Sequence, residues 1–281
     1  MTRIIIDSAA DYGMAAAAEK GMKVAPLTYL IEGNSYTDGV DLTSDEFFEM
    51  LERTGAFGQT SQVTPQGAIE AMTAARDEAP GEDLVCIALS SVLSGTHDSF
   101  CVAADAIDPE HIHVIDSLTA TAGSRILIDE ALRLADEGVP AAEIAEQIRA
   151  LVPRIRIFAC LDTLEYLKRS GRIPATAAAV GDRAKLKPVI EVYGDRGVTV
   201  MGATLGASRA VSSVAKRFKE VGFDSRYPRY SIWSYGTENV ELLEKKLAKD
   251  GAPVTGRYQI GPVIGTHIGP GACGICFVQP E

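Results

Sequence analysis

The chain has 281 residues, of which 46% are hydrophobic, and 27 basic and 38 acidic residues give it a formal charge of −11. This length suggests about two domains, and the acidic balance argues against nucleic-acid binding, because phosphate contacts need a surplus of Lys and Arg. No apolar run approaches the roughly 18 residues of a membrane helix, and no signal-peptide pattern precedes the first apolar run at residues 3–6. With five cysteines, an odd number, we expect a reduced, cytoplasmic protein without stable membrane insertion.

Residues 1–155 alternate between short apolar runs and helical patterns. Strands are expected at 3–6, 84–89 and 113–116, with an extended segment at 22–31. Helices are expected at 12–20, from Thr43 or Ser44 to 53, from a cap at Thr64 through 75, and at 96–107, 120–137 and 140–152. This alternation predicts an N-terminal α/β domain whose parallel sheet has helices on both faces.

Residues 156–281 differ in pattern and are expected to form a second α/β domain with a mixed or antiparallel sheet. A hairpin is predicted from 188–192 to 198–203, and further strands at 156–161, 230–234, 258–260 and 274–278. Helices are predicted at 164–169, at 208–221 with Ser208 as the cap, and at 238–249. Cys273 and Cys276 fall on the last strand, where a spacing of three places the thiols on opposite faces and argues against a metal or redox site.

The segment Ser-Ser-Val-Leu-Ser-Gly-Thr at 90–96 lies between a predicted strand and a predicted helix. The first N–H groups of a helix lack intrahelical partners and carry partial positive charge. Glycine allows close approach to the backbone, and hydroxyls add neutral donors. Ser94, Gly95 and Thr96 therefore predict an anion site.

Three other predicted strand ends carry small polar residues: Asp7–Ser8, Thr60–Ser61–Gln62 and Asp116–Ser117. Ligands of open parallel sheets bind beyond the carboxyl ends of the strands, so these residues are expected to line a neutral, donor-rich pocket. Helix capping is the alternative interpretation of each.

Two cationic or titratable side chains are candidates for holding the same anion. His267 lies within Gly265–Ala272, whose three glycines and one proline predict a tight loop, and its imidazole can donate to a carboxylate or phosphate. Arg172 follows Gly171 after a predicted helix, and its forked donors suit a carboxylate. For the neighbouring Lys168 and Arg169 we expect solvent-exposed charges that offset the helix dipole.

These residues leave alternative functions open. A serine hydrolase would use Ser94 as nucleophile, His267 as base and Asp7 or Asp116 to orient the base, although no G-x-S-x-G motif is present. A binding module for another small anion, such as a phosphorylated sugar, is the other alternative. No nucleotide-binding glycine motif follows a predicted strand.

Eight segments, in one order along nearly the whole chain, resemble the DegV family, the bacterial fatty-acid-binding proteins that serve fatty acid kinase. They are I-I-I-D-S-A-A-D at 4–11, the turn at Asp38-Gly39, T-S-Q-V-T-P at 60–65, S-S-V-L-S-G-T at 90–96, V-I-D-S at 114–117, L-E-Y-L-K-R-S-G-R-I at 164–173, L-K-P-V-I at 186–190 and T-H-I-G-P-G-A at 266–272. Ala9 and Val63 depart from the residues usual in the family, a threonine and a proline.

The resemblance implies two α/β domains with one long-chain acyl group buried between them. It implies that the carboxylate is held by the motifs that contain Thr60, Ser61, Ser94, Gly95, Thr96, Thr266 and His267, with Arg172 nearby. A separate kinase would phosphorylate the bound carboxylate to an acyl phosphate for phospholipid synthesis, docking near Arg209. The protein itself would have no catalytic residue, metal or cofactor, and we expect it to be a monomer.

Overall fold

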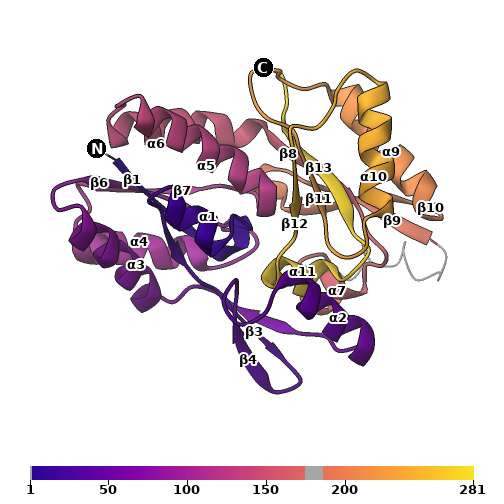
Figure 1. Ribbon diagram of the computed structural model, residues 1–281, viewed down its shortest axis with the longest axis horizontal. Helices are drawn as coiled ribbons and strands as arrows, with labels where there is room; N and C mark the ends of the chain where they lie inside the picture. The colour runs from indigo at the N-terminus through magenta and orange to yellow at the C-terminus, as the bar shows by residue number, and fades with distance from the viewer. Residues whose placement is uncertain (1, 175–185) are drawn as a thin grey trace.

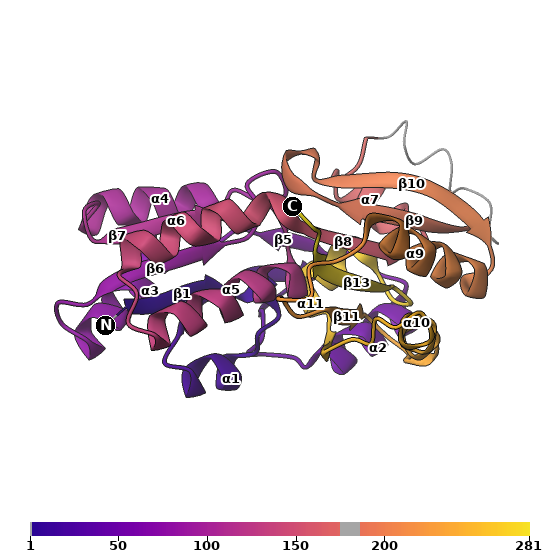
Figure 2. The ribbon, with the colours of Figure 1, turned by 90° about the horizontal axis from the view of Figure 1, so that it is seen from above.

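The computed structural model describes residues 2–174 and 186–281, which form three sheets with helices packed around them (Figures 1 and 2). The first sheet is parallel and has four strands in the order β2 (Lys23–Ala25), β1 (Thr2–Asp7), β6 (Asp83–Ala88) and β7 (Ile112–Asp116). Its helices are α1 (Met14–Glu19), α3 (Pro65–Glu78), α4 (Thr96–Ile107), α5 (Thr121–Asp136) and α6 (Ala141–Leu151).

Alternating residues of the parallel sheet supply both of its packed faces. Ile4 and Ile6 of β1 belong to the core shared with α5 and α6, whereas Ile5 between them belongs to the core shared with α3 and α4. Because both faces are buried, these strands are apolar throughout, as parallel strands covered by helices require. The prediction of a parallel sheet covered on both faces is confirmed.

A small antiparallel sheet extends below the parallel sheet in Figure 1. Its strands follow the order β4 (Asn34–Thr37), β3 (Thr28–Ile31) and β5 (Gln59–Ser61), and the helix α2 (Ser44–Thr54) belongs to the same region. Our sequence analysis expected one extended segment at 22–31, which is divided here between β2 and β3. Glu32 and Gly33 both have positive φ, which turns the chain into a hairpin.

The second half of the chain forms a mixed sheet of six strands. Their order is β10 (Val198–Leu205), β9 (Leu186–Val192), β8 (Ile155–Cys160), β13 (Cys273–Val278), β11 (Tyr230–Trp233) and β12 (Gly256–Gln259). Only the pair of β11 and β12 is parallel. Three short 3-10 turns complete the described structure, η1 (Ser8–Ala10), η2 (Val152–Arg154) and η3 (Gly194–Arg196).

Helices α9 (Ala207–Val221) and α10 (Glu238–Lys249) cover the outer face of this mixed sheet, whereas α7 (Glu165–Arg169) and α11 (Pro262–Ile268) lie next to each other near α2 (Figure 1). Cys273 contributes to the outer core and Cys276 to the inner one, which confirms the prediction that their thiols are on opposite faces. The Sγ atom of Cys273 lies 3.4 Å from that of Cys160 on the neighbouring strand.

Two predicted helix starts are wrong. The helix expected at residue 12 begins at Met14, because Asp11 and Gly13 take positive φ and Tyr12 is buried in the core instead. Ser208 does not cap the helix that follows: α9 starts at Ala207 after Gly206, so Ser208 lies inside the first turn. Helices α4 and α10, by contrast, have the predicted bounds of 96–107 and 238–249.

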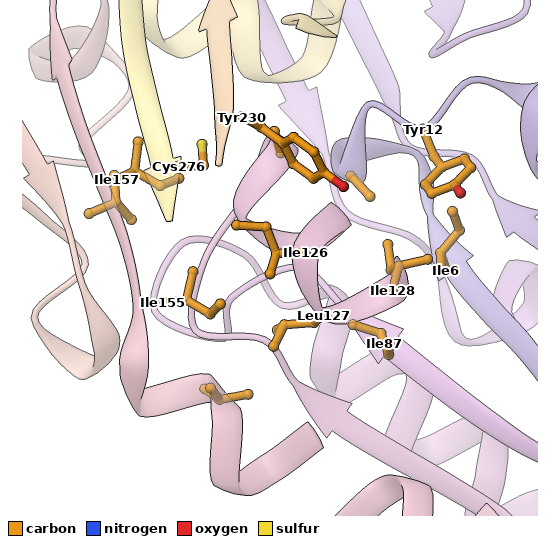
Figure 3. Close-up of a cluster of buried hydrophobic side chains, with 14 of the residues drawn as sticks. Ile6, Tyr12, Ile87, Ile126, Leu127, Ile128, Ile155, Ile157, Tyr230 and Cys276 are labelled. Carbon is orange, nitrogen blue, oxygen red and sulfur yellow. The ribbon is translucent and has the colours of Figure 1, made fainter. Parts of the chain in front are cut away.

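Helix α5 joins the two halves. Ile126, Leu127 and Ile128 lie in one buried cluster with Ile6 and Ile87 of the parallel sheet and with Ile155 and Ile157 of the mixed sheet (Figure 3). The predicted boundary at residue 155 coincides with the start of β8. That the two halves are separate domains stays a prediction, because this core is continuous between them.

A partly buried polar clamp on α5, in which Arg125 lies 4.0 Å from Asp129, also connects the halves. Asp129 accepts hydrogen bonds from the hydroxyls of Tyr12 at 3.0 Å and Tyr230 at 2.5 Å, which come from opposite halves of the chain. The Arg125 guanidinium lies 3.9 Å from the ring centre of Tyr12 and 3.8 Å from that of Tyr258. Such cation–π contacts strengthen when they are desolvated.

Replacing Asp129 with alanine should lower the free energy of unfolding by about 3 kcal/mol, because two tyrosine hydroxyls and a partly buried cation lose their common partner. Urea unfolding measures this directly. Tyr12→Phe and Tyr230→Phe each remove one hydrogen bond and should cost about 1 kcal/mol. A loss in Asp129→Ala no larger than that of either phenylalanine variant would contradict the clamp.

Candidate functional site

A mainly apolar cavity of about 180 Å³ lies between the two halves. Its floor is the inner face of the mixed sheet, where alternate residues of β8 and β9 point inward, among them Ile157, Ala159 and Ile190. Further apolar residues close it from both halves: Leu27, Leu89, Leu93, Ala120, Leu161, Leu167, Val192, Val198, Ile232, Ile260, Val263, Ile264, Ile268 and Ala272. A single water needs only about 10–15 Å³, so this space suits a larger, apolar ligand.

Polar side chains in the cavity wall come from β5 and the residue after it, the loop before α4 and the start of α5 in the first half, and from the turn after α7 and from α11 in the second. They are Thr60, Gln62, Ser94, Thr121, Arg172 and His267. Ser94, Gly95 and Arg172 also line a pocket on the molecular surface. The polar end containing these three residues is therefore the end that lies next to solvent.

His267 and Thr60 meet across the cavity, although 207 residues separate them in the chain. The Nε2 atom of His267 lies 2.9 Å from Thr60 Oγ1, and its Nδ1 atom is buried with no hydrogen-bond partner among residues 2–174 and 186–281. A proton on Nε2 avoids a buried, unpaired N–H at Nδ1, so we assign that tautomer. Nε2–H then donates to Thr60, whose own O–H is free to donate to a ligand.

The His267 ring is neutral at neutral pH. Burial, together with repulsion by the nearby Arg172 guanidinium, lowers its pKa to about 4. The imidazole therefore acts here as a hydrogen-bonding group without charge. Our sequence analysis placed His267 in a loop; it lies in the last turn of α11, and the glycine-rich loop begins only at Gly269.

Arg172 supplies the positive charge at this end of the cavity. Its guanidinium donates to the carbonyl oxygens of Leu93 at 3.2 Å and Ser170 at 2.5 Å. Neither acceptor is charged, and no ion pair of Arg172 occurs within the described ranges. The polar end thus carries one uncompensated cation among neutral donors, which favours a monoanionic head group.

Ser94 and Gly95 form the wall at the start of α4. Ser94 Oγ lies 3.0 Å from Thr96 Oγ1 and accepts from the Thr96 amide at 3.2 Å. Thr96 Oγ1 in turn accepts from the Val63 amide at 3.2 Å, so Thr96 holds the two loops together and is buried outside the cavity lining. A Cβ atom at Gly95 would lie 2.1 Å from Gln62 Oε1, so any larger residue there would displace the Gln62 side chain.

Two other predicted ligand residues also lie outside the cavity lining. Ser61 is exposed, and Thr266 is buried with its hydroxyl donated to the Pro262 carbonyl of its own helix. Gln62 takes the place expected for Ser61. Successive side chains of an extended chain point to opposite faces, so Thr60 and Gln62 share a face and Ser61 points away. This alternation could have been used at the sequence level to predict Gln62 in place of Ser61. Arg209 is exposed on α9, outside the cavity.

Helix α11 is positioned by buried carboxylates of the first half. Asp11 Oδ1 accepts from the Gly261 amide at 3.0 Å, and Asp38 Oδ1 accepts from the Val263 amide at 3.3 Å. Gly265 allows close packing on α2, since a Cβ there would lie 2.7 Å from the rings of Phe47 and Phe48. These contacts fix the helix that carries His267.

Burial raises the pKa of Asp38 to about 6, whereas an unfolded aspartate titrates near 4. The folded protein thus holds this proton at pH values where the unfolded chain has lost it, so the group's contribution to stability is lost as pH rises through 6. The asparagine of Asp38→Asn does not titrate, so this variant lacks that loss of stability. Its free energy of unfolding should therefore rise by about 3 kcal/mol relative to that of the parent as the pH increases from 4 to 7.5.

Urea unfolding of both proteins across this pH range measures the difference. His267 titrates in the opposite direction, because burial lowers its pKa, but its contribution is common to both proteins. Parallel stability curves for the parent and Asp38→Asn would show that Asp38 is not protonated in the folded state.

The polar strand ends serve local structure. Asp7 accepts from the amides of Ala9 and Leu89, and Asp116 accepts from those of Ser91 and Leu118. Both carboxylates thus bind backbone, while His267 Nε2 is bonded to Thr60. The arrangement that a Ser94–His267–Asp hydrolase requires is not assembled. Thr60 lies at the cavity as predicted, but the strand that carries it differs from the prediction. Its strand, β5, belongs to the small antiparallel sheet and not to the parallel one.

Neither a metal centre nor a membrane span is found in the described part of the chain. No group of three or more His, Cys, Asp or Glu side chains there can hold a metal ion. None of the helices at residues 2–174 and 186–281 combines the length and the apolar character needed to cross a bilayer.

Comparison with known proteins defines the class to which this fold and cavity belong. The family model described as "uncharacterised protein, DegV family" matches residues 1–280. A DegV domain-containing protein of Caldanaerobacter subterraneus subsp. tengcongensis is 33% identical over 281 residues, covering 98% of each chain. The chain belongs to the DegV family.

Solved structures of the family have the same fold. A DegV family protein from Thermus thermophilus, described as binding fatty acid, superimposes with a TM-score of 0.87 at 27% identity and 99% coverage of both chains. A stearic-acid-binding protein from Eubacterium ventriosum gives a TM-score of 0.88 at 24% identity, covering 99% of this chain and 98% of its own.

Proposed function

We propose that this protein buries one long-chain fatty acid between its halves, with the carboxylate at Thr60, Ser94, Arg172 and His267. The observation that carries the proposal is an apolar cavity whose solvent-side end gathers neutral donors and one unpaired guanidinium. The fatty-acid-binding relative from Thermus thermophilus supports it.

The energetics favour an acyl chain. Burying a methylene is worth roughly 0.8 kcal/mol, so about fifteen of them contribute on the order of 12 kcal/mol before the costs of ordering. A carboxylate buried without partners would cost several kcal/mol of this. The Thr60 hydroxyl, the Ser94 hydroxyl and the Arg172 guanidinium compensate that cost at the end where it arises.

The direct test is to identify what the purified protein retains. Native mass spectrometry and lipid extraction should recover a fatty acid in a one-to-one complex, and delipidated protein should take up palmitate or oleate. Recovery of no lipid together with no uptake of either acid would contradict the proposal. A small polar mass would instead favour a binding module for another anion.

We propose further that the protein is a cytoplasmic, monomeric carrier without its own cofactor, which presents the carboxylate to a separate fatty acid kinase for acyl-phosphate formation. The proximity of the polar end to the surface supports presentation, because a carboxylate oxygen there is accessible to a docked enzyme. Five free cysteines agree with a reducing compartment.

Arg209→Glu should slow phosphorylation of the bound fatty acid by a fatty acid kinase about ten-fold, because reversing an exposed charge at a docking surface lowers the association rate. Fatty acid affinity should not change, since Arg209 lies outside the cavity lining. Lys249→Glu, an equally exposed charge reversal on α10, is the control. Equal phosphorylation rates for the two variants would show that Arg209 is not part of the docking surface.

A further inference from the structure

A polar surface pocket lies directly outside the head-group end of the cavity. The two share a wall made of Leu93, Ser94, Gly95, Arg172 and Val198. A head group on the inner side of this wall is therefore separated from the outer pocket only by these side chains and the backbone around Gly95.

The outer pocket has an excess of positive charge, although the protein as a whole is acidic. Arg196, on the hairpin between β9 and β10, lines this pocket but not the cavity. Glu191 pairs with Arg196 at 3.4 Å and with Arg156 as well, so one carboxylate faces two guanidinium groups. Arg172 adds a third guanidinium, which has no acidic partner in the described part of the chain.

The backbone also contributes positive electrostatic potential to the outer pocket. Helix α4 has 12 residues, and its N-cap residue, Gly95, has no side chain to cap it. The Thr96 amide donates to Ser94 Oγ, so the amides that follow it and the helix dipole favour an anion in the pocket. The hairpin is held close to this helix start: a Cβ atom at Gly197 would lie 2.9 Å from Val92 Cγ1. Arg196 and the residues that precede α4 therefore line the same pocket.

We propose that this outer pocket is a phosphoryl subsite, which holds the phosphate of an acyl phosphate whose carbonyl end remains at Thr60 and His267. The inference rests on the proposed function. In the transfer, a carboxylate oxygen attacks the γ-phosphorus of a nucleoside triphosphate held by the kinase. The new bond joins that oxygen to phosphorus, the bond to the β,γ-bridging oxygen breaks, and the nucleoside diphosphate leaves with the electron pair.

The distribution of charge fits the product. The fatty acid brings one negative charge to the inner side, where Arg172 is the single cation among the described residues that line the cavity. The acyl phosphate carries up to two negative charges, and they lie one bond beyond the carboxylate oxygen, on the side where Arg196 and the α4 amides are located. Arg196 therefore distinguishes product from substrate, because only the phosphate reaches it.

The test compares palmitate with 2-oxoheptadecylphosphonate, a stable analogue of palmitoyl phosphate in which a methylene replaces the bridging oxygen. Titration calorimetry with delipidated protein gives both affinities. Arg196→Gln should weaken binding of the phosphonate about ten-fold, the size expected for one charge-assisted hydrogen bond, and leave palmitate unchanged. Arg156 still pairs with Glu191 in this variant, so the sheet keeps its ion pair.

Arg133→Gln is the matched control. Arg133 is 50% exposed against 52% for Arg196, it also pairs with glutamates, and it lies at the far end of α5. The subsite is overturned if the phosphonate fails to bind a protein that binds palmitate, or if Arg196→Gln weakens both ligands or neither. If neither ligand binds the parent protein, the proposed function itself fails.

Discussion

Ala159→Phe should reduce the affinity for palmitate about a thousand-fold. Ala159 lies on β8 and its side chain forms part of the cavity wall, so a benzyl group there occupies space that the acyl chain needs. Excluding about five methylenes removes about 4 kcal/mol of binding free energy, which corresponds to this loss. Fluorescent fatty acid displacement or calorimetry gives the affinity.

The fold should tolerate this substitution, because the added ring enters a cavity and does not displace packed side chains. The control is Val102→Phe, which places the same ring on the exposed surface of α4. Undiminished palmitate binding in Ala159→Phe, with thermal unfolding like that of the parent, would show that the acyl chain does not occupy this cavity.

His267→Ala should weaken palmitate binding about 10- to 100-fold and reduce phosphorylation by a kinase further. The substitution leaves Thr60 without the partner that orients its hydroxyl, and hydrogen bonds to charged groups are worth about 1.5–3 kcal/mol. His267→Gln keeps a side-chain donor and should restore part of the affinity.

Comparing palmitate with 1-hexadecanol separates head-group recognition from packing. The alcohol has the same chain length without a charge, so its affinity should fall much less in His267→Ala. An equal loss for both ligands would mean that the substitution disturbs the cavity and not the head-group contacts. Since burial and Arg172 hold the pKa of His267 at about 4, the parent's palmitate affinity should not change between pH 6.5 and pH 8.

Local patterns along the chain predicted most of the secondary structure. Thr43 and Thr64 cap the helices that follow them, as expected, because capping depends on residues three positions apart. Patterns failed where the backbone takes positive φ at residues other than glycine. Asp11 and Glu32 do so, and there the helix start and the hairpin were missed.

The sequence predicted only some of the residues that build the candidate site. Ser94, Gly95, Arg172, Thr60 and His267 all line one cavity, although they come from four separate segments. The strand-end carboxylates of Asp7 and Asp116 were interpreted as pocket residues, but they accept from nearby backbone amides. Asp11 and Asp38, which were not predicted as site residues, hold the N-terminus of α11. Their role depends on amides more than 200 residues away, which no local pattern can show.

The sequence by itself determined most of the strands and helices, the parallel first sheet and the residue types available to hold an anion, because propensity, periodicity and capping act over a few neighbouring residues. Only the tertiary structure decided which of these residues meet. The Thr60–His267 contact joins positions 207 apart, and the cavity exists because α5 and α11 pack between two sheets. Burial in that interface then sets the charge of the imidazole and leaves Arg172 as the cation of the site.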